Sequence, residues 1–202
     1  MEVESLAVLG EPQRRAVYEH VAAAAVPVSR DGVAEALGIG RNLAAHHLDK
    51  LAEAGLLEIS FAQRSGPRAG RPSKLYRRAP RELSVSLPPR GYRVLAEVFA
   101  DAVEEVGAEP ALYAAARKQG ARLAGEGDTE EVLRRLGYEP YPDGDVWRLR
   151  NCPFDGVART HPGVVCGANL ALLEGAIGPR VRIDPRPGGC CVVVDRDEEH
   201  RD

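Results

Sequence analysis

The chain has 202 residues and a formal net charge of -3, a length that suits two modest domains. Its apolar content of 44% is ordinary for a globular protein, and no segment approaches the roughly 18 apolar residues of a membrane helix. The N-terminus lacks the basic region and the apolar run of a signal peptide. These features exclude a membrane-spanning protein, and we expect a cytoplasmic one.

Charge is distributed unevenly along the chain. Residues 1–81 contain 12 Lys or Arg against 9 Asp or Glu, a net charge of +3, whereas residues 82–202 contain 15 against 21, a net charge of -6. A local excess of positive charge is what binding to DNA phosphates requires. The first part is therefore the candidate DNA-binding part, and we do not expect the acidic remainder to contact DNA.

Two helices are predicted near the start of the chain. The first covers residues 11–24. The second covers residues 30–37, where Ser29 is a suitable N-cap and Gly38 can end the helix in a left-handed conformation. Residues 26–28 between them are predicted to form a short strand or turn.

The next helix lies within residues 37–57 and is the predicted DNA-reading helix. Gly55 should end it. Apolar residues and one histidine recur at helical spacing on its core-facing side, namely Leu43, Ala44, His47, Leu48 and Leu51. On the other side, arginine can bind guanine and asparagine can bind adenine through paired hydrogen bonds. The predicted DNA contacts of this helix are Arg41, Asn42, His46 and Lys50.

Two strand-like segments, residues 56–65 and 73–80, follow this helix. From Arg64 to Arg81 the chain contains seven basic residues and no acidic residue. A helix that fits the major groove, followed by a basic hairpin, is the pattern of a winged helix-turn-helix. The predicted DNA contacts of the hairpin are Arg64, Arg68, Arg71 and Lys74.

Prolines at both ends of residues 80–89 predict an extended linker, because they are incompatible with a helix. Helical spacing of apolar residues then predicts helices over residues 90–106 and 111–124. Helices in this position either mediate dimerisation or pack on the C-terminal domain, and the sequence leaves both alternatives open.

The C-terminal part is predicted to be a small α+β sensor domain. Its expected elements are a helix over 129–136, a hairpin with a turn at 142–144, helices over 154–160 and 162–176, and strands over 181–183 and 191–194. The expected fold class is therefore α+β, in three parts. These are a winged helix-turn-helix domain (1–81), linker and dimerisation helices (82–124) and the sensor domain (125–202).

All four cysteines lie in this last part, at Cys152, Cys166, Cys190 and Cys191. In a cytoplasmic chain, such clustering favours metal, cluster or thiol chemistry over disulfide bonds. The spacing lacks the C-x2-C pair of structural zinc sites and the closely spaced run of ferredoxins. The residues alone therefore leave an iron–sulfur cluster, zinc, a thiol switch and inert packing open.

Local structure adds three expectations about this cysteine set. Cys152 should lie at a helix N-terminus, which favours its thiolate. On a regular strand Cys190 and Cys191 would point to opposite faces, so only one of them could join the other cysteines. His161 is a candidate fourth ligand, although a helix-capping or surface role is favoured.

Three segments together resemble one group of bacterial regulators. They are LGIGRNLAAHHLDKLAEAGLLEIS, the wing GPRAGRPSKLYRR, and the block NCPF, HPGVVCGANLALLEG and CC. Over nearly the whole chain they are similar to the SufR-like group of ArsR-type regulators. Gly40 departs from the pattern, because related helices usually have serine or threonine there.

The resemblance implies a homodimeric repressor that binds a double-stranded DNA operator. It also implies that the C-terminal cysteines hold an iron–sulfur cluster, of the 4Fe-4S type, whose occupancy sets operator affinity. We therefore predict a cluster-dependent transcriptional regulator, with Cys152, Cys166, Cys190 and Cys191 as the candidate ligands.

Other functions are compatible with the same pattern. The C-terminal part could sense zinc, thiol oxidation or a small ligand, or the chain could be an architectural DNA binder without a sensor. A DNA-binding module fused to a thiol enzyme is a further alternative. Because the sequence has no Walker, G-x-S-x-G or G-x-G-x-x-G motif, and Cys166 and His161 are poorly spaced as nucleophile and base, we expect no enzymatic activity.

Overall fold

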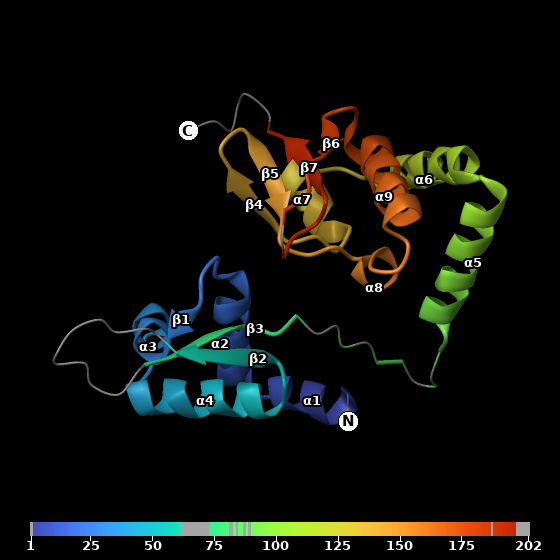
Figure 1. Ribbon diagram of the computed structural model, residues 1–202. Coiled ribbons are helices and arrows are strands. Elements are labelled where there is room, and N and C mark those ends of the chain that lie inside the picture. Colours follow the sequence, from blue (N-terminus) through green and yellow to red (C-terminus); the bar gives the residue numbers. More distant parts are fainter. Residues whose placement is uncertain are drawn as a thin grey trace. The chain divides into compact units, whose positions relative to one another are not determined.

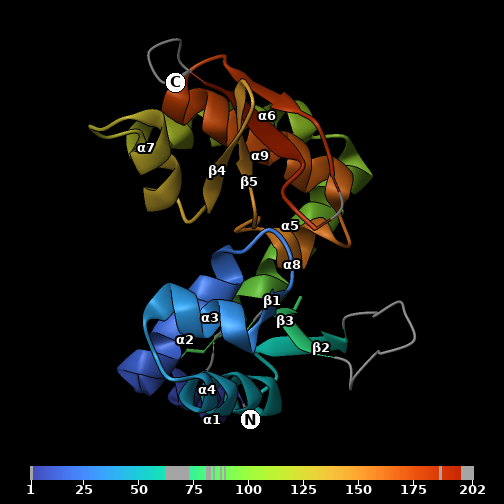
Figure 2. The same ribbon diagram turned by 90° about the vertical axis from the view of Figure 1, so that its left-hand side faces the viewer.

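The computed structural model describes residues 2–61, 73–80, 83, 85–86, 88, 90–186 and 188–196. The chain has the predicted α+β fold, and its elements are shown in Figures 1 and 2. It divides into two compact units, Met1–Arg90, called the head below, and Gly91–Asp202, called the cysteine unit. In the described ranges, no helix combines the length and apolar character needed to cross a membrane.

The head combines helices with a small sheet. Its elements are α1 (Glu2–Ala7), the 3-10 turn η1 (Val8–Gly10), α2 (Pro12–Ala23), β1 (Val28–Ser29), α3 (Arg30–Leu37), α4 (Arg41–Glu53), β2 (Leu57–Phe61) and β3 (Lys74–Arg78). The strand order is β1-β3-β2, with antiparallel pairing throughout, and Ile59 lies opposite Tyr76. This is the predicted winged arrangement, in which α3 and α4 form the helix-turn-helix and β2 and β3 form the wing.

The predicted helix ends explain why α3 and α4 form. The Ser29 hydroxyl accepts a hydrogen bond from the Gly32 amide at 3.1 Å, so it caps α3 as expected. Gly38 ends α3 at a φ of 63°, and Gly55 follows α4 at a φ of 72°. Both glycines therefore occupy the left-handed region that side chains with a Cβ atom rarely adopt.

The core of the head lies between the helices and the sheet. The buried residues are Val17, Val21, Val33, Ala44, Leu48, Leu51, Leu56, Leu57 and Tyr76. The α4 residues predicted to face inward are buried, with one exception. Leu43 is 39% exposed, because it lies at the edge of the apolar face of the helix, and its predicted core position was wrong.

In the described residues, the cysteine unit contains five helices and a second sheet of four strands. They are α5 (Tyr92–Val106), α6 (Glu109–Leu123), α7 (Thr129–Arg135), β4 (Pro140–Asp143), β5 (Val146–Leu149), α8 (Asp155–Ala158), α9 (Pro162–Ile177), β6 (Val181–Ile183) and β7 (Val192–Asp195). The sheet order is β4-β5-β7-β6, and each pairing is antiparallel. In Figure 1, α9 lies between the sheet and α6.

Glycines allow α6 and α9 to pack unusually closely. A Cβ atom added to Gly120 on α6 would lie 1.9 Å from the Leu172 carbonyl oxygen, and one added to Gly175 on α9 would lie 2.0 Å from the Arg117 carbonyl oxygen. The two helix backbones are therefore in direct contact at two places. The helices predicted over 90–106 and 111–124 both belong to the cysteine unit, where α6 packs along α9.

Two local predictions for this unit were wrong. The hairpin turn is at Gly144 and Asp145, and Pro142 lies within β4. Because β4 is at the edge of the sheet, a proline without an N–H is tolerated there, and Gly144 takes the left-handed turn position at a φ of 61°. The last strand begins at Val192, so the two adjacent cysteines precede it.

Candidate DNA interface and cysteine cluster

The predicted DNA-reading side of α4 is accessible. The four residues predicted to contact DNA there, Arg41, Asn42, His46 and Lys50, are all exposed. Gly40 is the N-cap of this helix and supplies no side-chain hydrogen bond. The helix therefore exposes two cations, an amide and an imidazole to solvent.

His47 lies on the opposite side of α4 and is only 4% exposed. Neither ring nitrogen has a hydrogen-bond partner among the described residues, and Nδ1 lies 3.7 Å from Oε2 of Glu11. Burial lowers the pKa of His47, because the protein interior disfavours the charged imidazolium. His47 is therefore a neutral core histidine and not part of the accessible surface.

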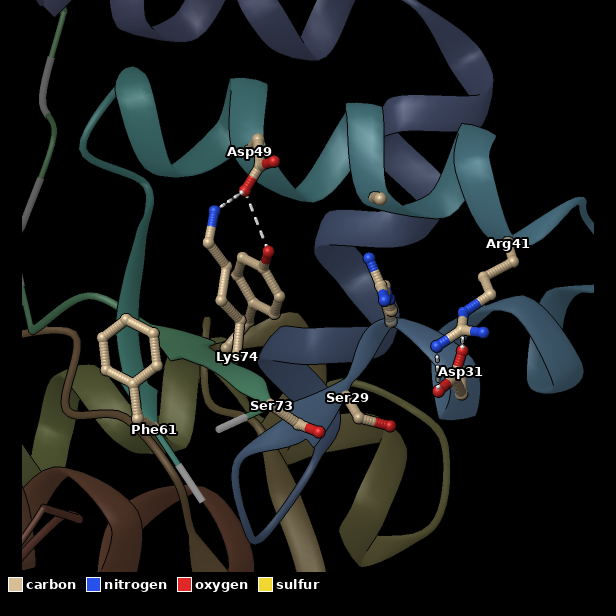
Figure 3. Close-up of a pocket in the computed structure, with 10 residues that line it drawn as sticks. Ser29, Asp31, Arg41, Asp49, Phe61, Ser73 and Lys74 are labelled. Atoms are coloured by element: carbon tan, nitrogen blue, oxygen red, sulfur yellow. Dashed lines mark hydrogen bonds and ion pairs between the residues drawn. The ribbon is translucent and has the colours of Figure 1, made fainter. Parts of the chain in front are cut away.

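A groove of about 430 Å³ lies between the helices α3 and α4 and the strands of the head (Figure 3). Its lining comes from β1, α3, α4, β2 and β3 and consists of Ser29, Arg30, Asp31, Arg41, Ala45, Asp49, Phe61, Ser73, Lys74 and Tyr76. Two predicted DNA contacts, Arg41 and Lys74, are thus on its opposite sides. The groove is lined by both cationic and anionic side chains.

Each of these two cations is held by a carboxylate from another element. The Arg41 guanidinium binds Asp31 on α3 through two contacts, Nε to Oδ1 at 2.5 Å and Nη2 to Oδ2 at 3.2 Å. Lys74 on β3 binds Oδ1 of Asp49 on α4 at 2.8 Å, and the buried Tyr76 hydroxyl donates to the same oxygen at 2.9 Å. Figure 3 shows both arrangements. The ammonium of Lys74 and the Tyr76 hydroxyl hold the pKa of Asp49 below its usual range, so Asp49 links the helix to the wing as a carboxylate.

The remaining predicted contacts of the head differ in how they are placed. Lys50 pairs with Glu53 on its own helix at 2.8 Å. Arg64, Arg68 and Arg71 lie outside the described residues, so their predicted contacts with DNA stay predictions. Arg41, Lys50 and Lys74, the predicted DNA-contacting cations that the structure describes, are therefore each paired with a carboxylate. On binding, DNA phosphates or bases would have to replace these carboxylates or share the cations with them.

The four cysteines come together in the cysteine unit although the sequence separates them. Cys190 forms hydrogen-bonded contacts with Cys152 and Cys191, and Cys191 forms one with Cys166. Cys152 lies before α8, Cys166 lies within α9, and the adjacent pair precedes β7. The prediction that only one of the adjacent cysteines could join the group was wrong, because this segment is not a regular strand.

One thiol of the cysteine group differs from the others in the direction of its pKa shift. Hydrogen bonds from Cys152, Cys191 and Asn169 lower the pKa of Cys190 far below that of a free thiol. The contacts with Cys190, together with burial, raise the pKa of Cys152 and Cys191. A thiolate was predicted at Cys152 from a helix N-terminus, but α8 has only four residues, and the contact with Cys190 and burial raise the pKa of Cys152.

Asn169 and Tyr138 lie beside the group of four cysteines and were not identified from the sequence. Asn169 is 1% exposed, and its Nδ2 donates to the Cys190 sulfur at 3.3 Å. Its Oδ1 accepts a hydrogen bond from the Tyr138 hydroxyl. The available signal was the single amide in the otherwise apolar segment GANLALL (residues 167–173), since a buried amide needs polar partners.

His161 is not part of the cysteine group in this arrangement. It is 9% exposed, and its ring lies between Glu104 at 3.2 Å and Asp101 at 3.6 Å, both on α5. His161 was expected to cap a helix or to lie on the surface. It is the N-cap residue of α9, without a side-chain capping hydrogen bond, and it is buried, so the surface alternative was wrong. In the described part of the chain, no three His, Cys, Asp or Glu side chains are spaced to hold a single metal ion.

Comparison with known proteins bears on the head. Residues 9–60 match the model of a family described as a helix-turn-helix domain. The match supports an ArsR-type helix-turn-helix, in agreement with the winged arrangement of the head. It thereby supports a DNA-binding transcriptional regulator. It ends before the second wing strand and does not reach the cysteines. No curated protein matches the chain.

Proposed function

We propose that the protein is a dimeric transcriptional repressor whose operator affinity is set by an iron–sulfur cluster on Cys152, Cys166, Cys190 and Cys191. The observation that carries this proposal is the convergence of four thiols from three separate segments in a unit that accompanies a DNA-binding head. Thiolates are the usual ligands of iron–sulfur clusters. Taking up a cluster would exchange the contacts between the thiols for bonds to iron.

The residues around the thiols fit such a group in their chemistry. Asn169 already donates to the Cys190 sulfur, and hydrogen bonds to ligand sulfurs tune the reduction potential of iron–sulfur clusters. Tyr138 holds the amide of Asn169 in place. When bound, a cluster would supply bridges between the segment before α8, the helix α9 and the segment before β7, together with a charge that changes on oxidation.

Helix α5 supports the dimeric part of the proposal. Tyr92, Leu95, Phe99 and Val106 are between 50% and 74% exposed and, with Ala102, lie on one side of the helix. Their separation alternates between three and four residues, which is the spacing of a coiled-coil seam. A self-complementary seam of this kind suits a second copy of the same helix, since isologous contacts use the same residues twice.

The first experiment is anaerobic purification, followed by a visible absorption spectrum and analysis of iron, sulfide and zinc. A brown protein with broad visible absorption that air bleaches would support the proposal. Stoichiometric zinc, or a colourless protein after attempted cluster reconstitution, would reject the iron–sulfur part. DNA selected by the protein from a randomised duplex library then provides the probe for affinity with and without the cluster.

Serine variants connect the cluster to DNA binding. Cys152→Ser and Cys166→Ser should each abolish the visible absorption and change affinity for the selected duplex by at least about tenfold, the middle of the usual range of allosteric coupling. Ala168→Ser is the matched control, because it adds one hydroxyl to the same helix as Cys166 without removing a thiol. Wild-type absorption and affinity in both cysteine variants would contradict the proposal.

The dimer has its own test. Phe99→Glu should convert the protein to a monomer in sedimentation equilibrium, since it places a charge within the seam. Val94→Glu is the control, because Val94 is 63% exposed on the same helix but lies outside the 3-4 spacing. A dimer that survives Phe99→Glu, or a monomeric wild-type protein, would remove α5 as the dimer contact.

The direct contacts between the thiols favour a second candidate, a thiol switch. Cys152 and Cys190 are in contact and free, so a peroxide could oxidise them to a disulfide with release of two molecules of water. Mass spectrometry after peroxide treatment of the metal-free protein would detect the loss of two hydrogen atoms. A switch predicts that this disulfide changes DNA affinity reversibly on reduction, whereas the cluster proposal requires iron for the change.

A further inference from the structure

The contact between Arg41 and Asp31 has a specific geometry. Asp31 occupies one edge of the guanidinium, formed by Nε and Nη2, with contacts of 2.5 and 3.2 Å. A guanidinium has five N–H donors in a planar fork. Among the described residues, the contacts of Asp31 use the Nε and Nη2 side of this fork, which leaves the edge formed by Nη1 and the second hydrogen of Nη2 for a second partner.

That available edge matches one base. Arginine recognises guanine in the major groove by donating two parallel hydrogen bonds to O6 and N7. Such a pair requires the guanidinium plane to be held in one orientation, and an exposed arginine otherwise has many rotamers. Arg41 is 59% exposed at its side chain and begins α4, so Asp31 is the group that restricts it.

Asp31 itself is on a fixed element. It lies in the first turn of α3, which Ser29 caps and whose Val33 side chain is fully buried. The Gly38 turn then joins α3 to α4, so the distance between Asp31 and Arg41 is set by the helix-turn-helix. Lys50 differs, because its partner Glu53 lies one turn away on the same helix and no second element holds the pair.

We propose that Asp31 is a specificity-determining positioning residue, which holds Arg41 so that the free edge of its guanidinium binds guanine in the operator. The inference rests on the proposed function, because it assigns a role within the DNA-reading helix. It adds a residue from outside that helix, and it does not depend on the cysteine unit.

This role has effects of opposite sign on two measurable quantities. A carboxylate close to DNA repels phosphates, so Asp31 lowers the affinity for every duplex. It also fixes the arginine for one base, so it raises discrimination at one position. Removing its charge should therefore strengthen binding to unrelated DNA and weaken the preference for guanine.

The test is selection from a randomised duplex library with the full chain, followed by affinity measurements at one fixed salt concentration. The wild-type protein should select a guanine whose replacement weakens binding. In Asp31→Asn the penalty for replacing that guanine should shrink by about fivefold or more, the lower end of the discrimination given by a bidentate contact. Affinity for a shuffled duplex should rise in the same variant.

Two further variants separate positioning from charge and from folding. Glu58→Gln also removes one negative charge from the head but leaves Arg41 untouched, so it should increase binding to shuffled DNA and keep the guanine preference. Arg41→Lys keeps the charge without the fork and should lose the preference in the presence or absence of Asp31. The effects of Asp31→Asn and Arg41→Lys on the preference should therefore be non-additive, whereas two independent defects would add.

Other outcomes would overturn the inference in distinguishable ways. If Asp31→Asn binds all duplexes more tightly and keeps the guanine preference, Asp31 merely neutralises Arg41. If the wild-type protein selects a sequence that Arg41→Lys selects equally well, the DNA-binding function stands but Arg41 and Asp31 do not read it. Selection of no sequence at all would reject both this inference and the proposed regulator. Far-UV circular dichroism of each variant must match the wild type for these comparisons.

Discussion

The head and the cysteine unit place their candidate functional residues differently relative to their cores. In the head, Arg41 and Lys74 lie on the surface, above a core of aliphatic side chains and one tyrosine. In the cysteine unit, Cys190 is 5% exposed and belongs to the core itself, together with Leu149 and Val192. The supporting residue Asn169 is even more deeply buried.

This difference follows from what each unit would bind. A DNA duplex is a large external partner, so the residues that read it must be exposed and contribute little to folding. Thiols that hold a cluster or exchange hydrogen bonds need shelter from water, because solvent access changes their charge and reactivity. In the head, a substitution at a DNA-contacting residue should therefore change DNA binding with little change in the free energy of unfolding. In the cysteine unit, a substitution at the cysteine group should change both its chemistry and the free energy of unfolding. Four substitutions test this distinction, beginning with the largest expected effect.

Gly120→Ala should unfold or strongly destabilise the cysteine unit. Its Cβ atom would lie 1.9 Å from the Leu172 carbonyl oxygen, so α6 and α9 would have to separate. We expect a loss of about 3 kcal/mol in the free energy of unfolding, the upper end for overpacking. The fluorescence of Trp147, the only tryptophan of the chain and a core residue of this unit, reports the transition in urea.

Gly163→Ala is the control for this experiment, because a Cβ atom added there has no neighbour within 4 Å. It should leave the Trp147 transition nearly unchanged. DNA binding by the head should persist in Gly120→Ala under conditions where Trp147 has become exposed. If DNA binding were lost at the same urea concentration at which Trp147 becomes exposed, the two units would unfold together, and the comparison would be weakened.

Asn169→Ala should have an intermediate effect that joins stability to the cysteines. The substitution removes the donor to the Cys190 sulfur and leaves the buried Tyr138 hydroxyl without its acceptor. The cost should be about 1–3 kcal/mol, as for other buried polar groups that lose a partner. Trp147 fluorescence in urea measures the cost. Thiol reactivity measured in the folded protein should fall at Cys190, because the lost hydrogen bond favours its thiolate.

The matched comparison is Ala168→Ser, one residue earlier on the same helix. It should change the free energy of unfolding by no more than about 0.5 kcal/mol and leave the reactivity of Cys190 unchanged. An Asn169→Ala protein with wild-type stability and thiol reactivity would mean that the amide does not support the cluster.

His47→Leu should change how the stability of the head depends on pH. Burial lowers the pKa of His47 in the folded protein below its ordinary value of 6.5, so the unfolded chain binds more protons as the pH falls. Wild-type stability should therefore decrease as the pH is lowered from about 7 through 6.5 and below, and His47→Leu should flatten this slope. Urea transitions followed by far-UV circular dichroism at several pH values measure it.

His46→Leu provides the control, because His46 is the adjacent but exposed histidine. That variant should keep the wild-type slope. Equal slopes in the wild type and in His47→Leu would indicate that another group governs the pH dependence of the head.

Arg41→Ala should have the smallest effect on stability. Its contact with Asp31 is an exposed ion pair, and such pairs contribute between zero and about 1 kcal/mol. We expect a change within about 0.5 kcal/mol in the free energy of unfolding, together with a marked loss of affinity for the selected duplex. A large loss of stability would instead make Arg41 a structural residue and would contradict the separation of function from folding in the head.

The sequence predicted most of the head because its signals are local. Ser29 and Gly38 bound α3 through contacts within a few residues, and helical spacing identified the buried side of α4. Leu43 was misplaced because spacing alone does not show how wide a buried face is. The partners of Arg41 and Lys74 were also not predicted, since Asp31 and Asp49 come from other elements.

The cysteine unit was less predictable because its candidate site depends on contacts between distant segments. Spacing placed Cys190 and Cys191 on a regular strand, which would have separated them, whereas the strand begins one residue later. Asn169 could not be assigned to a sulfur before the positions of α9 and β7 were known. The burial of His161 was missed for the same reason, because its partners lie on α5.

The glycines between α6 and α9 have a mechanical consequence. Two helices separated by large side chains can slide or tilt as those side chains change rotamer, but helices whose backbones touch have no such freedom. A displacement of Cys166 on α9 would therefore carry α6 with it as part of one rigid lever. A turn of Gly107 and Ala108 joins α6 to α5, and His161 at the start of α9 also contacts Asp101 and Glu104 on α5. A displacement at the thiol of Cys166 would therefore be passed to α6 and α5 together with α9.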